Sequence, residues 1–558
     1  MEKAKKPPLY TRIFRHKAFL PVTLFAVIII VFTFSSRFSE RPPVIDSISP
    51  EIGNPGDILI ITGDYFGETR DGGEVRIAGS RPTTSSYKEW SDTRISVQIP
   101  QDAGSGMLYV VTKNGRSKGH LFTNRQHIPV VMEGPARPGL PYVDEITPTN
   151  GTVGTLITIT GMNFGIERGS SKVYFTPVPI TDGVRQAEES RDLLLSPEEC
   201  DYDYEHWADT EIRVYIPDGA SSGNVSVFTD KGQSNFLYFE VSEQAGTKIL
   251  KQKRGYQIQY GVQLFNVRAS EGNLISLWVP RLSGGLEQTN IEMIQDPEPY
   301  WDTYPGLFVY RFENVPDAAR LSVSQTYWFD RYAVETKIKS TKVENQYNTD
   351  RTLYKVYTSN DVFVPSDDAE IQNIANSVIK NEKNPYLKAL SLFQYVLRRY
   401  SYTNQPVVTD PVESIETREG DAYIYAMVYC ALLRSGGVPS RPVAGYIVYG
   451  NKQKVRHYWV EFYLENFGWV PVDPALADGA VFGDFPEAED PENYYFGNID
   501  NQHIMFSQGI LQTKQLSHNA NVIRKKRMYS LQTIHEESSK NIASYSSVWQ
   551  DISVIDWW

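Results

Sequence analysis

The chain has 558 residues and a formal net charge of −12 at pH 7, with a sequence pI near 5.3. This length is too great for one hydrophobic core and predicts about three to five domains. The acidic balance argues against nucleic acid as a partner, and two cysteines, Cys200 and Cys430, are too few for a disulfide framework.

The N-terminus has the pattern of a membrane anchor. Six basic side chains lie in residues 1–17, and the uncharged apolar run Ala18–Phe34 follows them. We therefore predict a cytoplasmic basic tail over residues 1–17 and a transmembrane helix over residues 18–36. Only Arg37 and Arg41 follow closely. The positive-inside rule then predicts a single-pass inner-membrane protein whose bulk is periplasmic or extracellular. A cleaved signal peptide is the alternative, but no small-x-small cleavage site follows the apolar run.

An internal repeat follows the apolar run. The segment Ile45–Pro50 recurs as Val143–Pro148, and Trp90 recurs as Trp207. The offset between the copies is 98 residues at the first pair and 117 at the second, so the second copy carries a 19-residue insertion. Short alternating segments separated by Gly, Pro and Asp turns predict an immunoglobulin-like β-sandwich for each copy.

The residues shared by the two copies resemble the IPT/TIG domain pattern, which implies one such domain at residues 42–127 and another at 140–242. Such domains either bind a partner or act as spacers, and the sequence leaves both roles open. The insertion, over about residues 178–205, is rich in aspartate and glutamate. We expect a solvated acidic loop there, since its spacing does not bring several oxygens to one point as a calcium site requires.

The hydrophobic pattern changes after the repeat. Apolar residues alternate with polar ones from Tyr256 to Leu264, which predicts a further β-sandwich over residues 248–357. Helical periodicity then begins, and Ser366 is expected to cap one helix and Asn384 the next.

The remaining segments predict an α+β core over residues 364–515. An apolar helix ends after Arg434 at a Gly-Gly pair, and two strands follow at about His457–Leu464 and Trp469–Val472. Residues 516–558 form a C-terminal extension that is expected to contain closing strands.

The most informative motif lies within this core. Its positions are Gly420, Ala426, Arg434, Pro439, Arg441, Gly445, His457, Trp459, Glu461, Trp469, Asp473 and Pro474. This set resembles the transglutaminase-like superfamily, a papain-like α+β fold with a cysteine at a helix start, a histidine on a strand and an aspartate on the next strand. The resemblance implies that His457 and Asp473 are two catalytic positions, and it places Ala422 where the family has its cysteine.

Together the segments predict a multidomain fold class. It comprises an N-terminal transmembrane helix, two immunoglobulin-like IPT/TIG β-sandwiches, a further β-sandwich, and an α+β papain-like transglutaminase core. The further sandwich resembles the domain that commonly precedes bacterial cores of this kind, so a bacterial envelope protein is expected.

The residue at position 422 decides the predicted function. An alanine has no nucleophilic atom, and Cys430 lies about 12 Å further along the same helix, in an apolar run typical of a buried cysteine. The sequence therefore predicts a pseudoenzyme that binds a protein, peptide or cell-wall ligand in the triad cleft. Two alternatives remain. One is an active acyltransferase or cysteine peptidase whose native gene encodes cysteine at position 422, and the other is a scaffold whose cleft has no role.

No cofactor and no metal site are expected. A zinc site needs three or four well-placed ligands, and the eight histidines are spread along the chain. His503 is interpreted as a core or loop residue.

Overall fold

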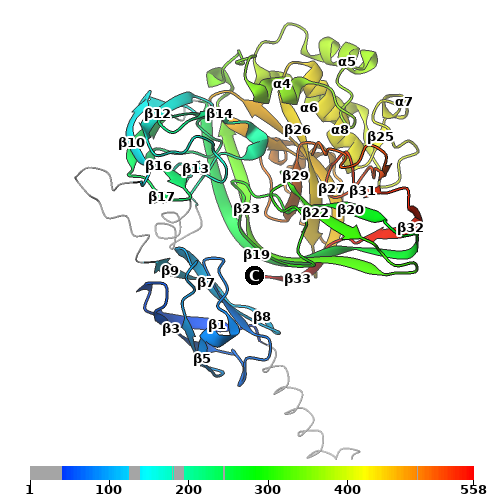
Figure 1. Cartoon of the computed structure of the whole chain (residues 1–558). Helices are drawn as coiled ribbons and strands as arrows, with labels where there is room; N and C mark the ends of the chain where they lie inside the picture. Colours follow the sequence, from blue (N-terminus) through cyan, green and yellow to red (C-terminus); the bar gives the residue numbers. More distant parts are fainter. Residues whose placement is uncertain (1–40, 125–138, 179, 181–193, 243–244, 487) are drawn as a thin grey trace, which may run out of the picture. The chain divides into compact units, whose positions relative to one another are not determined.

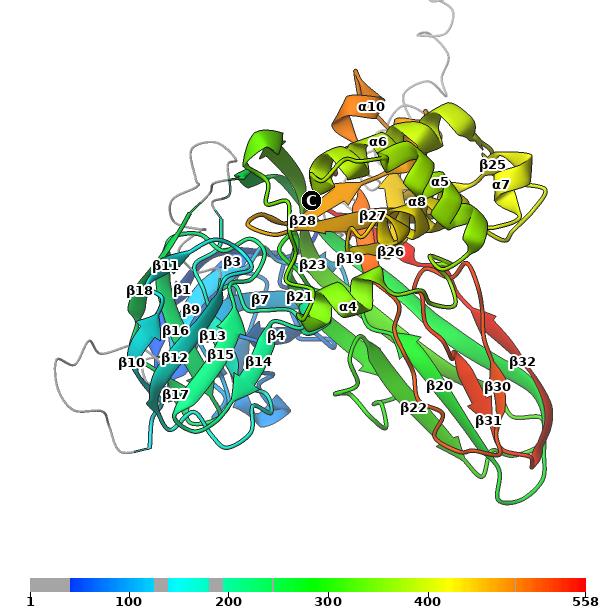
Figure 2. The same cartoon turned by 90° about the horizontal axis from the view of Figure 1, so that it is seen from above.

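The computed structural model describes residues 41–124, 139–178, 180, 194–242, 245–486 and 488–558 (Figures 1 and 2). The chain divides into two compact units, Met1–Glu133 and Gly134–Trp558. Most of the regular structure in the described residues is β-sheet, and a few helices lie between Thr352 and Tyr494.

The first unit is a β-sandwich of two sheets. Its strands are Val44–Ser49 (β1), Ile52–Gly53 (β2), Ile58–Asp64 (β3), Glu74–Ile77 (β4), Tyr87–Trp90 (β5), Arg94–Gln98 (β6), Gly106–Thr112 (β7), Gly115–Arg116 (β8) and His120–Asn124 (β9). One sheet has the order β1-β3-β6-β5 and the other β2-β9-β7-β4, with β8 on β7. Alternate residues such as Leu59 and Ile61 are buried between the sheets, as the predicted alternation requires.

The second unit begins with the same sandwich. Its strands are Tyr142–Thr147 (β10), Asn150–Gly151 (β11), Leu156–Met162 (β12), Lys172–Tyr174 (β13), Tyr204–Trp207 (β14), Glu211–Tyr215 (β15), Gly223–Thr229 (β16), Gly232–Gln233 (β17) and Leu237–Val241 (β18). The orders β10-β12-β15-β14 and β11-β18-β16-β13 match those of the first copy. The strand register shifts at equivalent places, after Ile45 in β1 and after Val143 in β10. The two copies therefore share this irregularity in strand pairing as well as their strand order.

A larger sandwich follows, built from strands at both ends of the remaining chain. Its strands are Gly246–Ala269 (β19), Leu274–Pro280 (β20), Gln288–Asp296 (β21), Leu307–Glu313 (β22), Leu321–Ile338 (β23), Asn521–Ile523 (β30), Glu536–Ser538 (β31), Ile542–Trp549 (β32) and Ser553–Trp557 (β33). The sheets are β21-β23-β19-β32, with β33 also on β19, and β22-β20-β31-β30. The C-terminal extension therefore completes this sandwich with closing strands.

The α+β core lies between these two groups of strands. Its helices are Thr352–Thr358 (α4), Ala369–Ile379 (α5), Pro385–Arg399 (α6), Ser414–Thr417 (α7), Ala422–Ser435 (α8), Pro474–Ala477 (α9) and Pro491–Tyr494 (α10). Its strands are Ser401–Tyr402 (β24), Glu419–Gly420 (β25), Ser440–Tyr449 (β26), Gln453–Leu464 (β27), Gly468–Val472 (β28) and His503–Gln508 (β29). The central sheet has the order β28-β27-β26-β29.

Both faces of this central sheet are covered. Helices α5, α6 and α8 pack on one face (Figure 2), where α8 is buried along nearly its whole length. On the other face, Val443 and Trp459 pack with Tyr332 and Val334 of β23. A helix that is apolar all round belongs in such an interior, and this explains the unbroken apolar run in its sequence.

The helix caps agree with the sequence at one position and differ at another. Asn384 accepts hydrogen bonds from the backbone N–H groups of Tyr386 and Leu387, so its predicted capping of α6 is confirmed. The prediction for Ser366 is wrong, because Asp368 accepts the equivalent bonds at the start of α5. Both residue types are good caps, and the start of the helix two residues later decides between them.

The predicted transmembrane helix, and the single-pass membrane localisation drawn from it, need correction. Residues 18–36 lie outside the described residues, and no helix within the described ranges is long and apolar enough to cross a membrane. The longest helix there, α6, has 15 residues. It therefore spans about 22 Å, which is short of the roughly 30 Å of a bilayer's hydrocarbon core. The fold class is accordingly that of a mostly β multidomain protein with a few helices.

Candidate functional site

The start of α8 forms one side of the candidate site. Asp421 caps the helix by accepting a hydrogen bond from the backbone N–H of Ile424 (3.1 Å). Ala422 is the first helical residue and is buried. Gly420 precedes the cap, and a β-carbon there would collide with the side chain of Ile424, so the tight entry into the helix requires glycine.

His457 and Asp473 lie together on the neighbouring strands. His457 is on β27, and Asp473 follows β28 and caps α9 through Oδ1, which accepts from the N–H groups of Ala475 and Leu476. The other oxygen, Oδ2, accepts a hydrogen bond from His457 Nε2 at 2.5 Å. One oxygen of the Asp473 carboxylate therefore caps α9, and the other orients the imidazole of His457.

A second imidazole, which the sequence reading treated as a core or loop residue, joins the same carboxylate. His503 Nε2 donates to Asp473 Oδ2 at 3.0 Å, and His503 Nδ1 donates to Asp500 Oδ1 at 2.9 Å. The signal for it in the sequence is the Asp-x-x-His spacing of residues 500–503, which places both groups at the start of β29. The site is thus a series of four side chains linked by hydrogen bonds: His457, Asp473, His503 and Asp500.

The protonation states of His503 and Asp473 follow from these hydrogen bonds. Burial alone would lower the pKa of His503, but the charges and hydrogen bonds of Asp500 and Asp473 outweigh it and raise the pKa to about 9. Burial would raise the pKa of Asp473, yet the two imidazoles lower it below its usual range. At neutral pH His503 is therefore a buried imidazolium between two carboxylates.

Among the four linked side chains, His457 has a ring nitrogen, Nδ1, without a hydrogen-bond partner in the described residues. His457 is fully buried, and its ring packs edge-on against Phe482 at 5.5 Å. A buried ring nitrogen without a partner is costly.

The three groups at the centre could also be considered as metal ligands. His457, Asp473 and His503 are buried, and each offers a ligand atom within 4.8 Å of the other two. Two ligand atoms on one tetrahedral zinc ion, each about 2.1 Å from the metal, lie about 3.4 Å apart. The separations of 2.5 and 3.0 Å are hydrogen-bond distances, so the geometry favours a proton-linked chain over a metal site.

The alternative nucleophile is not part of this site. Cys430 is fully buried in α8, and its Sγ lies 3.3 Å from the hydroxyl of Ser440. Burial raises the pKa of the Cys430 thiol, which keeps it protonated and unreactive. The prediction of a buried structural cysteine is confirmed.

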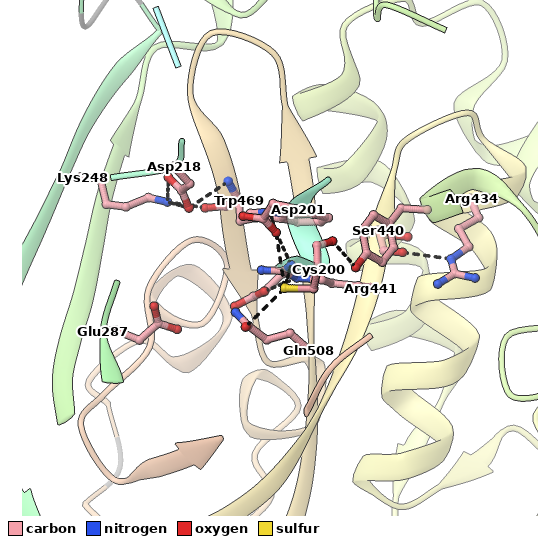
Figure 3. A network of polar contacts seen from close by, with 12 residues as sticks. Cys200, Asp201, Asp218, Lys248, Glu287, Arg434, Ser440, Arg441, Trp469 and Gln508 are labelled. Carbon is pink, nitrogen blue, oxygen red and sulfur yellow. Dashed lines mark hydrogen bonds and ion pairs between the residues drawn. The ribbon is translucent and has the colours of Figure 1, made fainter. Parts of the chain in front are cut away.

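A separate buried network joins the second repeat to the central sheet (Figure 3). Arg441 on β26 contacts Glu461 at 2.7 Å and Asp201 at 2.6 Å, and its guanidinium lies 3.9 Å from the ring centre of Trp469. Trp469 Nε1 also donates to Asp201 at 3.1 Å. Because Asp201 belongs to the acidic insertion, the expectation of a solvated loop is wrong at this position.

The same insertion makes a second buried ion pair. Asp203 contacts Arg351 at 2.5 Å, and both side chains are at most 3% exposed. Asp218, just beyond the insertion, contacts Lys248 at 2.6 Å. These carboxylates have guanidinium or ammonium partners, which is the usual condition for a buried charge. Asp201 and Asp203 of the insertion therefore serve contacts within the unit.

Comparison with known families agrees with this architecture. Residues 372–474 match the transglutaminase-like superfamily, and residues 43–126 and 141–240 each match the IPT/TIG domain. The chain therefore contains one transglutaminase-like domain and two IPT/TIG domains, as the residue patterns predicted.

Curated relatives match only a short part of the chain. A cyclomaltodextrin glucanotransferase of Bacillus licheniformis is 36% identical over 77 residues, 14% of this chain and 10% of that protein. The corresponding enzyme of Paenibacillus macerans is 29% identical over 86 residues, 15% of this chain and 12% of that protein. The chain thus spans about a tenth of the length of these relatives.

Similar solved structures have low identity. A proposed cysteine protease from Cytophaga hutchinsonii is 14% identical, with 56% of this chain and 91% of that chain covered and a TM-score of 0.34. A TGase structure is 15% identical, with coverage of 35% and 51% and a TM-score of 0.18. A surface glycan-binding protein from Prevotella bryantii is 10% identical, with coverage of 52% and 98% and a TM-score of 0.16.

Proposed function

We propose that the transglutaminase-like domain is a pseudoenzyme, which binds a protein, peptide or cell-envelope ligand at the start of α8, where the family resemblance implies a ligand cleft, and does not transform it. Two observations carry this proposal together. His457 forms a buried pair with Asp473, and its Nδ1 has no hydrogen-bond partner among the described residues. Ala422 stands at the first position of the helix. In this proposal, His457 and Asp473 are the groups that would activate and orient a nucleophile. The nucleophile itself is absent, because a methyl group cannot attack a carbonyl carbon.

The alternative is an active enzyme whose native gene encodes cysteine at position 422. One observation favours it: a single Ala422→Cys change would restore the family pattern and would place a thiol at a helix N-terminus, where the helix dipole favours the thiolate. Sequencing of the gene at this codon separates the two proposals directly. An alanine codon supports the pseudoenzyme.

The test of the pseudoenzyme has two parts. The unmodified chain is expected to show no transglutaminase, peptidase or thioester-forming activity. The Ala422→Cys variant is expected to have a thiol pKa well below about 8.5, read from the pH dependence of iodoacetamide labelling. A second His457→Ala change should move that pKa back toward the free value, and Cys430 should label slowly in every variant because it is buried.

One outcome would refute this proposal, and a second would show that only the family's fold remains at the site. Acyl transfer by the unmodified chain would show that a nucleophile exists elsewhere. A thiol at position 422 that titrates like free cysteine, whatever residue stands at position 457, would show that the site no longer has catalytic geometry.

We also propose the domain division expected from the residue patterns. It assigns IPT/TIG domains to residues 42–127 and 140–242, a β-sandwich to 248–357, the transglutaminase-like core to 364–515 and an extension to 516–558. The strands of the extension pair with β19 and β20, which supports treating the extension as the closing part of the sandwich. The buried contacts of Asp201 and Asp203 favour a structural role for the second IPT/TIG domain.

A further inference from the structure

A segment of the C-terminal extension, Arg524–Tyr529, lies beside the start of α8. Arg527 forms an ion pair with Asp421, the cap of the helix. Its Nη2 donates to the carbonyl oxygen of Thr409 at 3.2 Å, and its guanidinium lies 4.7 Å from the ring centre of Tyr423. One arginine side chain is therefore held by a carboxylate, a carbonyl and an aromatic face.

The next residue of the segment reaches the other side of the site. The hydroxyl of Tyr458 donates to the carbonyl oxygen of Met528 at 2.8 Å, and the Tyr458 ring packs edge-on against Tyr423 at 5.2 Å. Tyr458 directly follows His457, and Tyr423 directly follows Ala422. The segment is thus attached to direct neighbours of both site positions.

The backbone of Arg527 also has an unusual conformation. Its φ is +59°, a left-handed conformation that residues other than glycine rarely adopt. The neighbouring side chains of Arg524 and Lys526 are exposed, so the segment touches the site mainly through Arg527 and Met528. The three groups around the guanidinium match its charge, its flat face and its fixed set of donors.

We propose that Asp421, Tyr423 and the carbonyl of Thr409 form a guanidinium-binding subsite of the ligand cleft, and that Arg527 fills this subsite from within the chain. Residues 524–527 then act as an intramolecular strap that blocks the cleft, and the strap is anchored by Met528 and Tyr529, which are buried in the core of the large sandwich. The inference rests on the proposed function, since it takes the cleft to be a binding site. The ligand class that fits is an extended peptide whose arginine replaces Arg527 when the strap is released.

The first experiment measures binding of a peptide by the full chain. The probe is fluorescein-labelled Lys-Lys-Arg-Met-Tyr-Ser, the sequence of residues 525–530, and its control has citrulline in place of arginine. Arg527→Ala empties the subsite, whereas Arg524→Ala removes an equal charge from an exposed neighbour. We expect Arg527→Ala to bind the arginine peptide at least about tenfold more tightly than the unmodified chain or Arg524→Ala does.

A second variant tests the carboxylate of the subsite. Asp421→Asn keeps a residue that caps helices well but removes the charge, so adding it to Arg527→Ala should abolish binding of the arginine peptide. The citrulline peptide should bind none of the variants measurably. Equal binding by the unmodified chain and Arg527→Ala, or equal binding of the two peptides, overturns the proposal.

A second readout reports whether the strap covers the site. In the Ala422→Cys background, at a pH above the pKa of the new thiol, Arg527→Ala should raise the iodoacetamide labelling rate about tenfold because the ion pair and the cation–π contact are lost. Arg524→Ala should leave the rate unchanged, and an unchanged rate in Arg527→Ala also overturns the strap. Catalysis by the unmodified chain would refute the pseudoenzyme without refuting the strap, which the peptide measurement tests independently.

Discussion

At the scale of single residues, the site is organised by opposite charges that are removed from water. The His503 imidazolium lies between the carboxylates of Asp473 and Asp500, and these hydrogen bonds compensate for the desolvation of all three groups. Asp473 in turn holds the ring of His457 through Nε2. The orientation of the candidate catalytic imidazole therefore depends on a residue 30 positions beyond the aspartate that holds it.

This arrangement predicts a pH dependence of stability. The pKa of His503 is about 9 in the folded chain, above the ordinary histidine value of 6.5. The group therefore contributes its full stabilisation below pH 6.5, and this is lost as the pH rises through about 9. His503→Gln should lower the free energy of unfolding by about 3 kcal/mol at pH 6, and by much less at pH 10.

The measurement is urea unfolding of the unmodified chain and the variant at the two pH values. His206→Gln, at an exposed position, is the matched control and should change stability little at either pH. A difference between the unmodified chain and His503→Gln that is equal at pH 6 and pH 10 would contradict a charged His503.

At the scale of elements, four of the helices in the core begin where a side chain satisfies the first free N–H groups. Asp368 performs this task for α5, Asn384 for α6, Asp421 for α8 and Asp473 for α9. Two of these caps, Asp421 and Asp473, are also parts of the candidate site or its neighbouring subsite. The same local chemistry therefore fixes the helix starts and places charged groups beside the site.

The cap of α5 provides a direct test. Asp368→Ala should destabilise the chain by about 1 kcal/mol, because two backbone N–H groups lose their acceptor. Ser366→Ala should cost much less, since Ser366 does not cap the helix. Thermal unfolding of the two variants checks this, and an equal loss of stability in both would show that the helix begins earlier than the structure indicates.

The network around Arg441 gives a second test at this scale. Arg441→Met would leave the buried carboxylates of Asp201 and Glu461 without their cation, at a cost of about 3–5 kcal/mol. Arg268→Met breaks an exposed pair with Asp317 and should cost less than about 1 kcal/mol. Chemical denaturation compares the two variants, and similar losses would mean that the buried network contributes no more than a surface pair.

At the scale of the whole molecule, residues 134–558 behave as one compact unit. The second IPT/TIG domain supplies Asp201, Asp203 and Asp218, which pair with cations of the core and the large sandwich. The repeat in the sequence predicts two similar domains, over residues 42–127 and 140–242, ahead of the large sandwich and the core. The structure groups the second copy of the repeat with the core.

This grouping predicts the behaviour of fragments. Residues 246–558 alone lack Asp201, Asp203 and Asp218, each of which pairs with a buried cation of the core or the large sandwich. They should therefore unfold at a lower temperature than residues 139–558 or aggregate. Residues 41–124 have their own hydrophobic core and should fold alone. Thermal unfolding and limited proteolysis of the three fragments test this. A fragment of residues 246–558 as stable as residues 139–558 would contradict the structural role of the second IPT/TIG domain.

Features encoded over short distances could be read from the sequence. The repeat, the alternating strands, the cap at Asn384 and the order of Ala422, His457 and Asp473 all depend on periodicity, turn residues or motif spacing. Such patterns report which residues an element buries and where it starts. They do not report which element it meets.

The contacts that complete the site, and those of the separate network around Arg441, were decided by the tertiary structure. His503 reaches Asp473 across 30 residues, Arg527 reaches Asp421 across 106, and Asp201 reaches Arg441 across 240. The strands of residues 521–557 likewise close a sandwich that begins at Gly246. These pairings follow from which surfaces pack together and exclude water, and a charged residue has the same local pattern whether it meets solvent or a buried partner.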